Sequence, residues 1–174
     1  CQDCGAGTYS EVMGATSEAT CQDCEAGKYS GQAASVCSDC VAGKYSGQAA
    51  SLCQDCVAGK YSGQAASLCQ DCVAGKYSSS TGAASESACT ICPQGSYTDM
   101  EASTTCPSCP AGRFNSDDAT SSSLHNSLST CSICPAGKYN PDLATDPALH
   151  TSCEACLPGK FNADNAVSTM LHDD

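Results

Sequence analysis

The sequence contains no tryptophan and only two phenylalanines among its 174 residues. Large aliphatic side chains are also sparse, whereas Ala, Ser and Gly dominate. Side chains this small cannot fill a thick hydrophobic core, so burial alone does not offset the entropy of ordering the chain. The composition therefore argues against an ordinary globular domain and calls for another source of stability.

Basic residues are scarce as well. Only seven Lys and Arg residues are present, and the formal net charge is −12. Binding to nucleic acid or to an anionic membrane surface needs clustered positive charge, so we expect neither partner. No run of about 18 apolar residues occurs, and the sequence predicts no membrane span in this segment. Because the chain opens on Cys1 without an initiator Met or a signal peptide, we expect it to be part of a longer protein.

Cysteine is the residue type that the chain has in excess. It accounts for 18 of the 174 residues, a proportion typical of disulfide-stapled secreted proteins. The number is even, as a closed disulfide framework requires. A cytosolic protein rarely keeps so many thiols unless they bind metal, so we expect an extracellular or cell-surface location.

The cysteines form nine C-x-x-C pairs, which begin 16 to 25 residues apart. Each pair is followed by x-x-Gly-x-aromatic, and these nine aromatics are the only ones in the chain: Tyr9, Tyr29, Tyr45, Tyr61, Tyr77, Tyr97, Phe114, Tyr139 and Phe161. All seven basic residues lie between the Gly and the aromatic: Lys28, Lys44, Lys60, Lys76, Arg113, Lys138 and Lys160. A self-similar period of this kind predicts a repeat array rather than a globular domain.

The repeats fall into groups by length. Residues 1–20 are a first repeat, 21–88 are compact repeats, 89–105 are transitional, and 106–174 are longer repeats of which the last is cut short. Residues 41–56 and 57–72 are identical. In the long repeats the aromatic is followed by Asn-x-Asp and then by Leu-His: Asn115, Asp117 and His125; Asn140, Asp142 and His150; Asn162, Asp164 and His172.

Little regular secondary structure is predicted. The residues around each Lys-Tyr favour a short strand, and the preceding Gly permits a turn with positive φ. The segments rich in Ser, Gly, Ala and Asp read as loops. We find no amphipathic helix of useful length and expect at most a helical turn near residues 146–150. The predicted fold is an elongated, solenoid-like ladder of small disulfide-rich repeats, with short strands, mostly irregular structure and little or no helix.

Three interpretations of C-x-x-C compete. A thioredoxin-like redox pair needs a βαβ scaffold, which the sequence does not indicate. Two adjacent pairs also have the spacing of a four-thiolate zinc site, although the nine pairs show no grouping by twos. In the third interpretation, a disulfide joins the second cysteine of one pair to the first cysteine of the next and closes a loop of useful size, worth about 3 kcal/mol by loop entropy. The spacing alone does not decide the connectivity.

C-x-x-C-x-x-G-x-[Tyr/Phe] with a small-residue loop resembles the ephrin-receptor-like cysteine-rich repeat, and is similar to the first half of tumour necrosis factor receptor modules. The long repeats also resemble those of flagellar-hair (mastigoneme) and other large surface proteins of protists. The resemblance implies a disulfide-laddered extracellular rod in which each aromatic packs on the next cystine. It supports the between-pair bonds Cys4–Cys21, Cys24–Cys37, Cys40–Cys53, Cys56–Cys69, Cys72–Cys89, Cys92–Cys106, Cys109–Cys131 and Cys134–Cys153. Cys1 and Cys156 would then pair outside this segment.

Each candidate functional residue also has a structural explanation, which we favour. The Lys row would form surface ion pairs with the acidic residues of C-x-Asp-C, which are Asp3, Asp23, Asp39, Asp55 and Asp71, although two rows of opposite charge would also let arrays align side by side. The tyrosines would cover disulfides rather than bind sugars. The Asn-x-Asp pairs would form turns rather than a calcium site, because no dense acidic loop is present. Ser/Thr-rich loops such as 119–130 would suit O-linked sugar.

The sequence predicts no enzyme and no cofactor, because it contains no recognisable nucleophile motif or phosphate-binding loop. Two hypotheses on function remain. In the first, the chain is a structural extracellular segment, a rod or filament whose partners are further copies of itself or other extracellular structural glycoproteins. In the second, it is the stalk or the ligand-binding ectodomain region of a receptor or adhesin.

Overall fold

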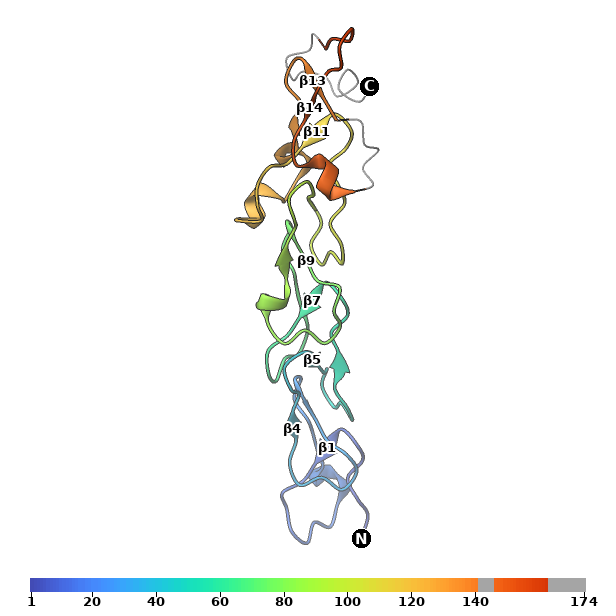
Figure 1. Ribbon diagram of the computed structural model, residues 1–174. Helices are drawn as coiled ribbons and strands as arrows, with labels where there is room; N and C mark the ends of the chain where they lie inside the picture. The colour runs from blue at the N-terminus through green and yellow to red at the C-terminus, as the bar shows by residue number, and fades with distance from the viewer. Residues whose placement is uncertain (141–145, 163–174) are drawn as a thin grey trace. The chain divides into compact units, whose positions relative to one another are not determined.

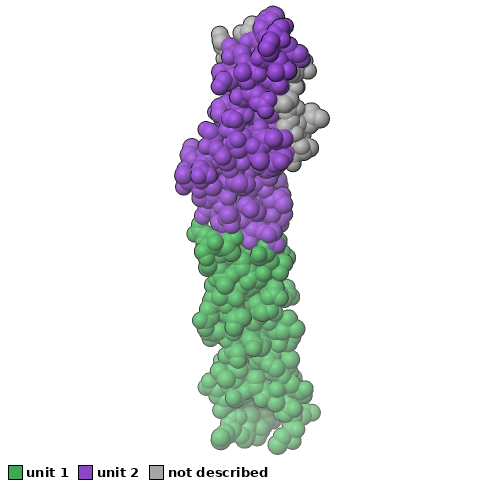
Figure 2. All heavy atoms as spheres, viewed as in Figure 1, with its two compact units in different colours: residues 1–71, 80–88 green, residues 72–79, 89–174 purple. Residues whose placement is uncertain are grey.

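The computed structural model describes residues 1–140 and 146–162. The chain divides into two compact units, which are residues 1–71 with 80–88 and residues 72–79 with 89–174 (Figure 2). The Asp142, Asp164 and His172 positions of the long-repeat pattern lie outside the described residues.

The first unit is built from pairs of two-residue strands, with one Lys-Tyr or Thr-Tyr strand and one strand from inside the next C-x-x-C in each pair. The antiparallel pairs are β1 (Thr8–Tyr9) with β2 (Gln22–Asp23), β3 (Lys28–Tyr29) with β4 (Ser38–Asp39), β5 (Lys44–Tyr45) with β6 (Gln54–Asp55), and β7 (Lys60–Tyr61) with β8 (Gln70–Asp71). Figure 1 shows these pairs following one another within the unit. Two 3₁₀ turns, η1 (Glu18–Thr20) and η2 (Glu86–Ala88), complete it.

The second unit repeats the arrangement with longer loops. Its antiparallel pairs are β9 (Lys76–Tyr77) with β10 (Thr90–Ile91), β11 (Arg113–Phe114) with β12 (Ser132–Ile133), and β13 (Lys138–Tyr139) with β14 (Glu154–Ala155). The added residues of the long loops form 3₁₀ turns η3 (Ser122–Leu124), η4 (Leu128–Thr130) and η5 (Pro147–His150). The helical turn expected near residues 146–150 is confirmed as η5.

One repeat lacks a strand pair. At Ser96 and Tyr97 only an isolated antiparallel bridge, Ser96 to Ser108, takes its place. The residue opposite Tyr97 is Pro107, whose carbonyl accepts from the Tyr97 amide at 3.0 Å. Proline has no N–H to return the second bond of an antiparallel pair, so the ladder stops at a single bridge.

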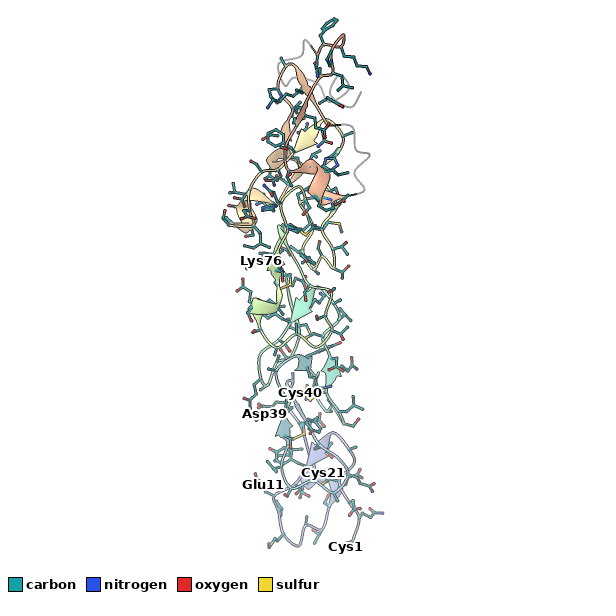
Figure 3. All side chains as sticks on the ribbon, viewed as in Figure 1. Cys1, Glu11, Cys21, Asp39, Cys40 and Lys76 are labelled. Atoms are coloured by element: carbon teal, nitrogen blue, oxygen red, sulfur yellow. A yellow bond between two sulfur atoms is a disulfide. The ribbon has the colours of Figure 1, made fainter. Side chains whose placement is uncertain are left out.

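Disulfides take the place of a hydrophobic core. Eight are present, each joining the second cysteine of one C-x-x-C to the first cysteine of the next, with Cα–Cα distances of 5.5–5.8 Å (Figure 3). Cys24, Cys40 and Cys56 are fully buried, and Ala83 is the one buried hydrophobic residue that is not a cysteine among the described residues. Because these sulfur atoms are bonded to one another, they are not available as thiolates for the four-thiolate zinc site considered above. Short strands, the absence of α-helix from the described residues and successive disulfides confirm the predicted disulfide-rich, mostly irregular fold class.

Eight of the nine aromatics are half-buried, and Phe161 is the exception. Its side chain is 88 % exposed. Lys160 and Phe161 are not in a strand, whereas the preceding Lys-Tyr pairs lie against the following C-x-x-C. In every other repeat the residues that flank the aromatic come from further along the chain, and here those after Asn162 lie outside the described part. The described residues therefore show no packing partner for the Phe161 ring.

Candidate functional site: the contacts between repeats

Within each unit, successive repeats are joined by the same set of backbone bonds around the invariant glycine. The Gly27 amide donates to the Ser46 carbonyl at 2.9 Å, and the Gly27 carbonyl accepts from the Cys40 amide at 2.9 Å. The same two bonds recur at Gly7, Gly43, Gly75, Gly95, Gly112 and Gly137 with their own partners. Because φ at Gly27 is +89°, this geometry favours glycine at the junction.

A second set of bonds holds the small-residue loop. The Ala49 amide donates to the Cys24 carbonyl at 2.8 Å, and the Ser30 amide donates to the Ala50 carbonyl at 3.2 Å. The loop thus lies on the opposite side of β3 from β4, through a parallel bridge between Tyr29 and Ala50. Equivalent bridges join Tyr9 to Ala34, Tyr45 to Ala66, and Tyr61 to Ala83. Each aromatic strand of the first unit is therefore bonded on both edges, to a strand on one side and to the small-residue loop on the other.

The residue after the aromatic makes the side-chain contact between repeats. Ser30 Oγ donates to the Thr8 carbonyl at 2.9 Å, Ser46 Oγ to the Lys28 carbonyl at 2.9 Å, and Ser62 Oγ to the Lys44 carbonyl at 3.0 Å. These three serines are at most 4 % exposed. Each buried hydroxyl bonds to a backbone carbonyl of the preceding repeat and so fixes the spacing between the two repeats. The serine side chain is small and occupies little volume at the junction. This position is Ser in the compact repeats and Asn in the long ones.

In the long repeats Asn and His replace the serine hydroxyl. Asn140 Nδ2 donates to the Arg113 carbonyl at 3.2 Å and to the Leu149 carbonyl at 2.9 Å, and His150 Nδ1 lies 3.1 Å from the same Arg113 carbonyl. Both side chains are at most 1 % exposed. The 3₁₀ turn η5, capped by the Asp146 carboxylate on the Ala148 amide, brings His150 to this place.

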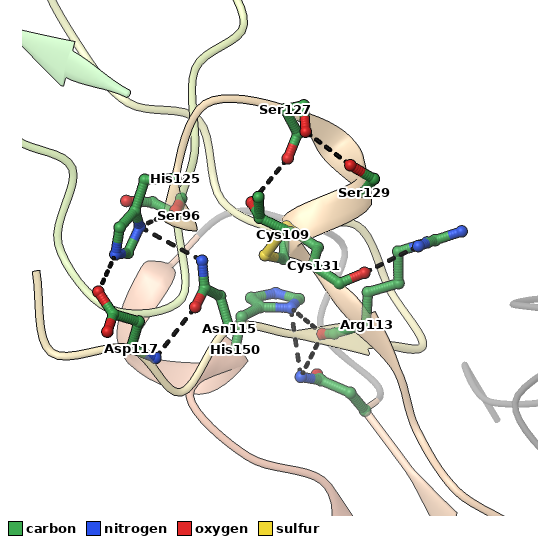
Figure 4. The surroundings of a disulfide bond; sticks show 12 residues. Ser96, Cys109, Arg113, Asn115, Asp117, His125, Ser127, Ser129, Cys131 and His150 are labelled. Atoms are coloured by element: carbon green, nitrogen blue, oxygen red, sulfur yellow. Dashed lines mark hydrogen bonds and ion pairs between the residues drawn. A yellow bond between two sulfur atoms is a disulfide. The ribbon is translucent and has the colours of Figure 1, made fainter. Parts of the chain in front are cut away.

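A second buried histidine lies at the junction before. His125 follows η3 and is 0 % exposed; its Nδ1 lies 2.8 Å from the Ser96 carbonyl and its Nε2 lies 3.0 Å from Asp117 Oδ2 (Figure 4). Asn115 Oδ1 accepts from the Asp117 amide at 3.0 Å, which confirms the predicted turn-forming role of Asn-x-Asp. Burial of His125 and His150 is not evident from the Leu-His pattern.

Hydrogen bonds that Thr120 donates to the Asp117 carboxylate hold the Asp117 pKa below its usual range. The contact with His125 lowers the same pKa by a smaller amount. Asp117 therefore remains ionised at neutral pH and presents a negative charge to the histidine ring. Among residues 1–140 and 146–162 no group of three or more His, Cys, Asp or Glu side chains converges as a metal site would require.

The Lys row forms the expected ion pairs with the next repeat. The Nζ–Oδ1 distances are 2.9 Å for Lys28–Asp39, 2.7 Å for Lys44–Asp55 and 2.6 Å for Lys60–Asp71. The register of the strands places these residues opposite one another. All are at least one-third exposed, so solvent screens the pairs and their contribution to stability is small.

Two of the five acidic residues in the expected row face something other than lysine. Asp23 lies opposite Thr8, one of the positions where the Lys row is interrupted. Asp3 and Asp23 accept instead from Gln32 and Gln48 Nε2, at 3.3 and 3.2 Å, and Asp39 accepts from Gln64 in addition to its lysine. The glutamine of the GQAAS loop therefore reaches the acidic residue of an earlier repeat, a contact between residues 25 to 29 positions apart.

Comparison with known families gives a match over part of the chain. Residues 83–124 match the family described as tyrosine-protein kinase ephrin type A/B receptor-like. This match and the successive disulfides fit an array of ephrin-receptor-like cysteine-rich repeats, an ectodomain-type module. The segment is accordingly an extracellular region of receptor-like or structural type. No curated protein matches the chain. In the described part of the sequence, no helix has the length and apolar character that a membrane crossing requires.

Proposed function

We propose that the chain is a structural extracellular segment, a rod or filament-forming array. The observation that carries this proposal is that successive repeats bond through the same atoms, as at Gly27–Ser46 and Gly43–Ser62, both 2.9 Å. A module that meets its neighbours only through identical contacts can be lengthened by whole repeats without altering any contact. Such a property suits a spacer or a fibre, whereas a single binding site gains nothing from copies of its surroundings.

The outer surface of the compact repeats supports lateral assembly with further copies. Large apolar side chains flank the disulfides and are 60 to 63 % exposed: Val36, Val41, Leu52, Val57 and Leu68. They recur with the 16-residue repeat, and only a partner with the same repeat could cover them all at equal intervals. Other extracellular structural glycoproteins with such repeats are equally suitable partners.

Electron microscopy of the chain and of a shortened variant tests the rod. Deletion of residues 41–56 leaves an identical repeat in their place and preserves every cysteine spacing. The variant should fold, keep one disulfide fewer and be shorter by one repeat step. A matched control that deletes residues 41–48 disrupts the Cys40–Cys53 spacing and should misfold or scramble its disulfides.

The second candidate is a receptor or adhesin stalk, or a ligand-binding ectodomain region, favoured by the family match at residues 83–124. Self-association of the chain separates the two candidates. A filament segment self-associates end to end or side by side, and Leu52→Ser with Leu68→Ser should reduce the lateral contact. If the chain stays dispersed and monomeric at all concentrations in the microscope and in sedimentation, the filament proposal is wrong and the stalk is favoured.

A further inference from the structure

The eight disulfides follow one another along the chain without interruption. Each begins three residues after the previous one ends, as where Cys24–Cys37 is followed by Cys40–Cys53. Only the two middle residues of a C-x-x-C motif lie between consecutive disulfides. From Cys4 to Cys153 a continuous covalent path therefore runs through the sulfur atoms and these short links, and it bypasses most of the backbone.

The path through the sulfur atoms is much shorter than the backbone that it bypasses. Cys40 and Cys53 are 13 positions apart in the sequence, and this backbone would span about 45 Å if it were pulled straight. Their disulfide holds the two Cα atoms 5.7 Å apart. The link from Cys53 to Cys56 adds about 10 Å at full extension. One compact repeat can therefore reach about 16 Å under tension, whereas its sixteen residues would reach about 55 Å without the disulfide.

We propose that the array bears tension, and that the disulfide ladder carries the load while the loops that it closes are unloaded. A pulling force that reaches the first cysteine of a disulfide passes through the sulfur atoms to the second, so the residues between the two are not stretched. The loaded backbone is limited to the C-x-x-C links, which include β4, β6 and β8. The Lys-Tyr strands that pair with these links lie inside the unloaded loops.

The exposed apolar side chains of the compact repeats also lie inside unloaded loops. Val41 and Leu52 belong to the loop that Cys40–Cys53 closes, and the next loop holds Val57 and Leu68 in the same way. Tension along the ladder therefore does not pull these two side chains of one loop apart. The load path serves a fibre and a stalk equally, so it does not rest on the self-association proposed above.

Single-molecule force spectroscopy of the full chain, pulled at constant force from its two ends, tests the load path. The oxidised chain should settle at one length and hold it. Added dithiothreitol, which is itself oxidised as it reduces each disulfide to two thiols, should then lengthen the chain in discrete steps. A loop with a sequence separation of 13 should release about 40 Å of contour length, and the Cys109–Cys131 loop, with a separation of 22, about 70 Å. Steps of these sizes without reductant, or no steps with it, would overturn the proposal.

Deletion of residues 41–56, which keeps every cysteine spacing, gives a second test. The stretched length should fall by about 16 Å in the oxidised chain but by about 55 Å after complete reduction. Equal shortening in the two states would contradict the load path.

The control for cysteine replacement combines Cys1→Ser with Cys156→Ser, because neither thiol is in a disulfide among the described residues. This variant should keep both stretched lengths of the parent chain and the same set of steps, and a missing step would show that the load path differs from the ladder. Because single molecules are pulled, a chain that never assembles leaves these outcomes unchanged, so failure of the filament proposal and failure of the load path are distinguishable.

Discussion

A Cβ atom placed on Gly27 would overlap the carbonyl oxygen of Ala65, which belongs to the second repeat after it. Gly27 also has φ of +89°, a backbone conformation that residues other than glycine rarely adopt. Contact between repeats thus extends beyond the nearest neighbour. The backbone carbonyl cannot move aside as the end of a flexible side chain would, since it is part of the loop that bonds Cys40.

Gly27→Ala should therefore destabilise the chain by about 3 kcal/mol or prevent correct oxidation, through steric overlap and left-handed strain together. Gly31→Ala is the matched control, because nothing lies within 4 Å of a Cβ at that position. Denaturant unfolding of the oxidised proteins measures the difference. Equal midpoints for the two variants would show that the repeats do not pack as closely as described.

The loop alanines offer a gain in stability. Ala49 has φ of +54°, a conformation that disfavours any residue with a Cβ, and its side chain is exposed. Gly82, with φ of +66°, makes the same bond two repeats later, from its amide to the Cys56 carbonyl. Ala49→Gly should raise the free energy of unfolding by about 1 kcal/mol. Ala50→Gly, at a position without positive φ, should lower it by roughly 0.5–1 kcal/mol, and the opposite signs should be visible in denaturant unfolding.

The buried serines contribute through one hydrogen bond each. Ser46→Ala removes the bond to the Lys28 carbonyl at a site that is 3 % exposed, and should lower the free energy of unfolding by about 1 kcal/mol. Ser51 lies in the same repeat but is exposed, so Ser51→Ala should have almost no effect. Thermal unfolding of both variants checks the pair. A larger loss from Ser51→Ala than from Ser46→Ala would contradict the assigned contact.

Local features of this fold can be predicted from the sequence because they depend on adjacent residues. The Lys-Tyr strands, the turn at Asn115–Asp117 and the opposition of Lys28 and Asp39 all follow from residue types repeated at one spacing. The left-handed conformation of the loop was not predicted. Glycine usually marks such a position in a sequence, and here the residue is Ala49.

Burial of His125 and His150 could not be predicted either. His125 is buried only because the η3 turn carries it onto Ser96 of the preceding repeat, a contact between residues 29 positions apart. The Leu-His pattern marks the position but says nothing about which acceptor the ring meets. A polar residue in a chain with so little apolar core would otherwise be expected on the surface.

The Lys28–Asp39 ion pair has a pH dependence that follows from the pKa shifts of its two members. The hydrogen bond and the positive charge of Lys28 lower the pKa of Asp39. In turn, the hydrogen bond and the negative charge of Asp39 raise the pKa of Lys28. Because the carboxyl pKa is lower in the folded state, Asp39 stabilises the fold at pH values above its pKa in the unfolded chain. This stabilisation is lost as the pH falls through its pKa in the folded chain. Because the ammonium pKa is higher in the folded state, Lys28 stabilises the fold at pH values below its pKa in the unfolded chain. This stabilisation is lost as the pH rises through its pKa in the folded chain.

The contribution of this pair should thus be constant from mildly acidic to mildly alkaline pH and small throughout, because both side chains are more than one-third exposed. Lys28→Gln should move the Asp39 titration, followed by carboxyl carbon NMR, back toward the ordinary range of aspartate. Lys44→Gln changes the same charge one repeat further on and pairs with Asp55, so it should leave the Asp39 titration almost unmoved. If both variants shift Asp39 equally, the effect is one of net charge rather than of the pair across β3 and β4.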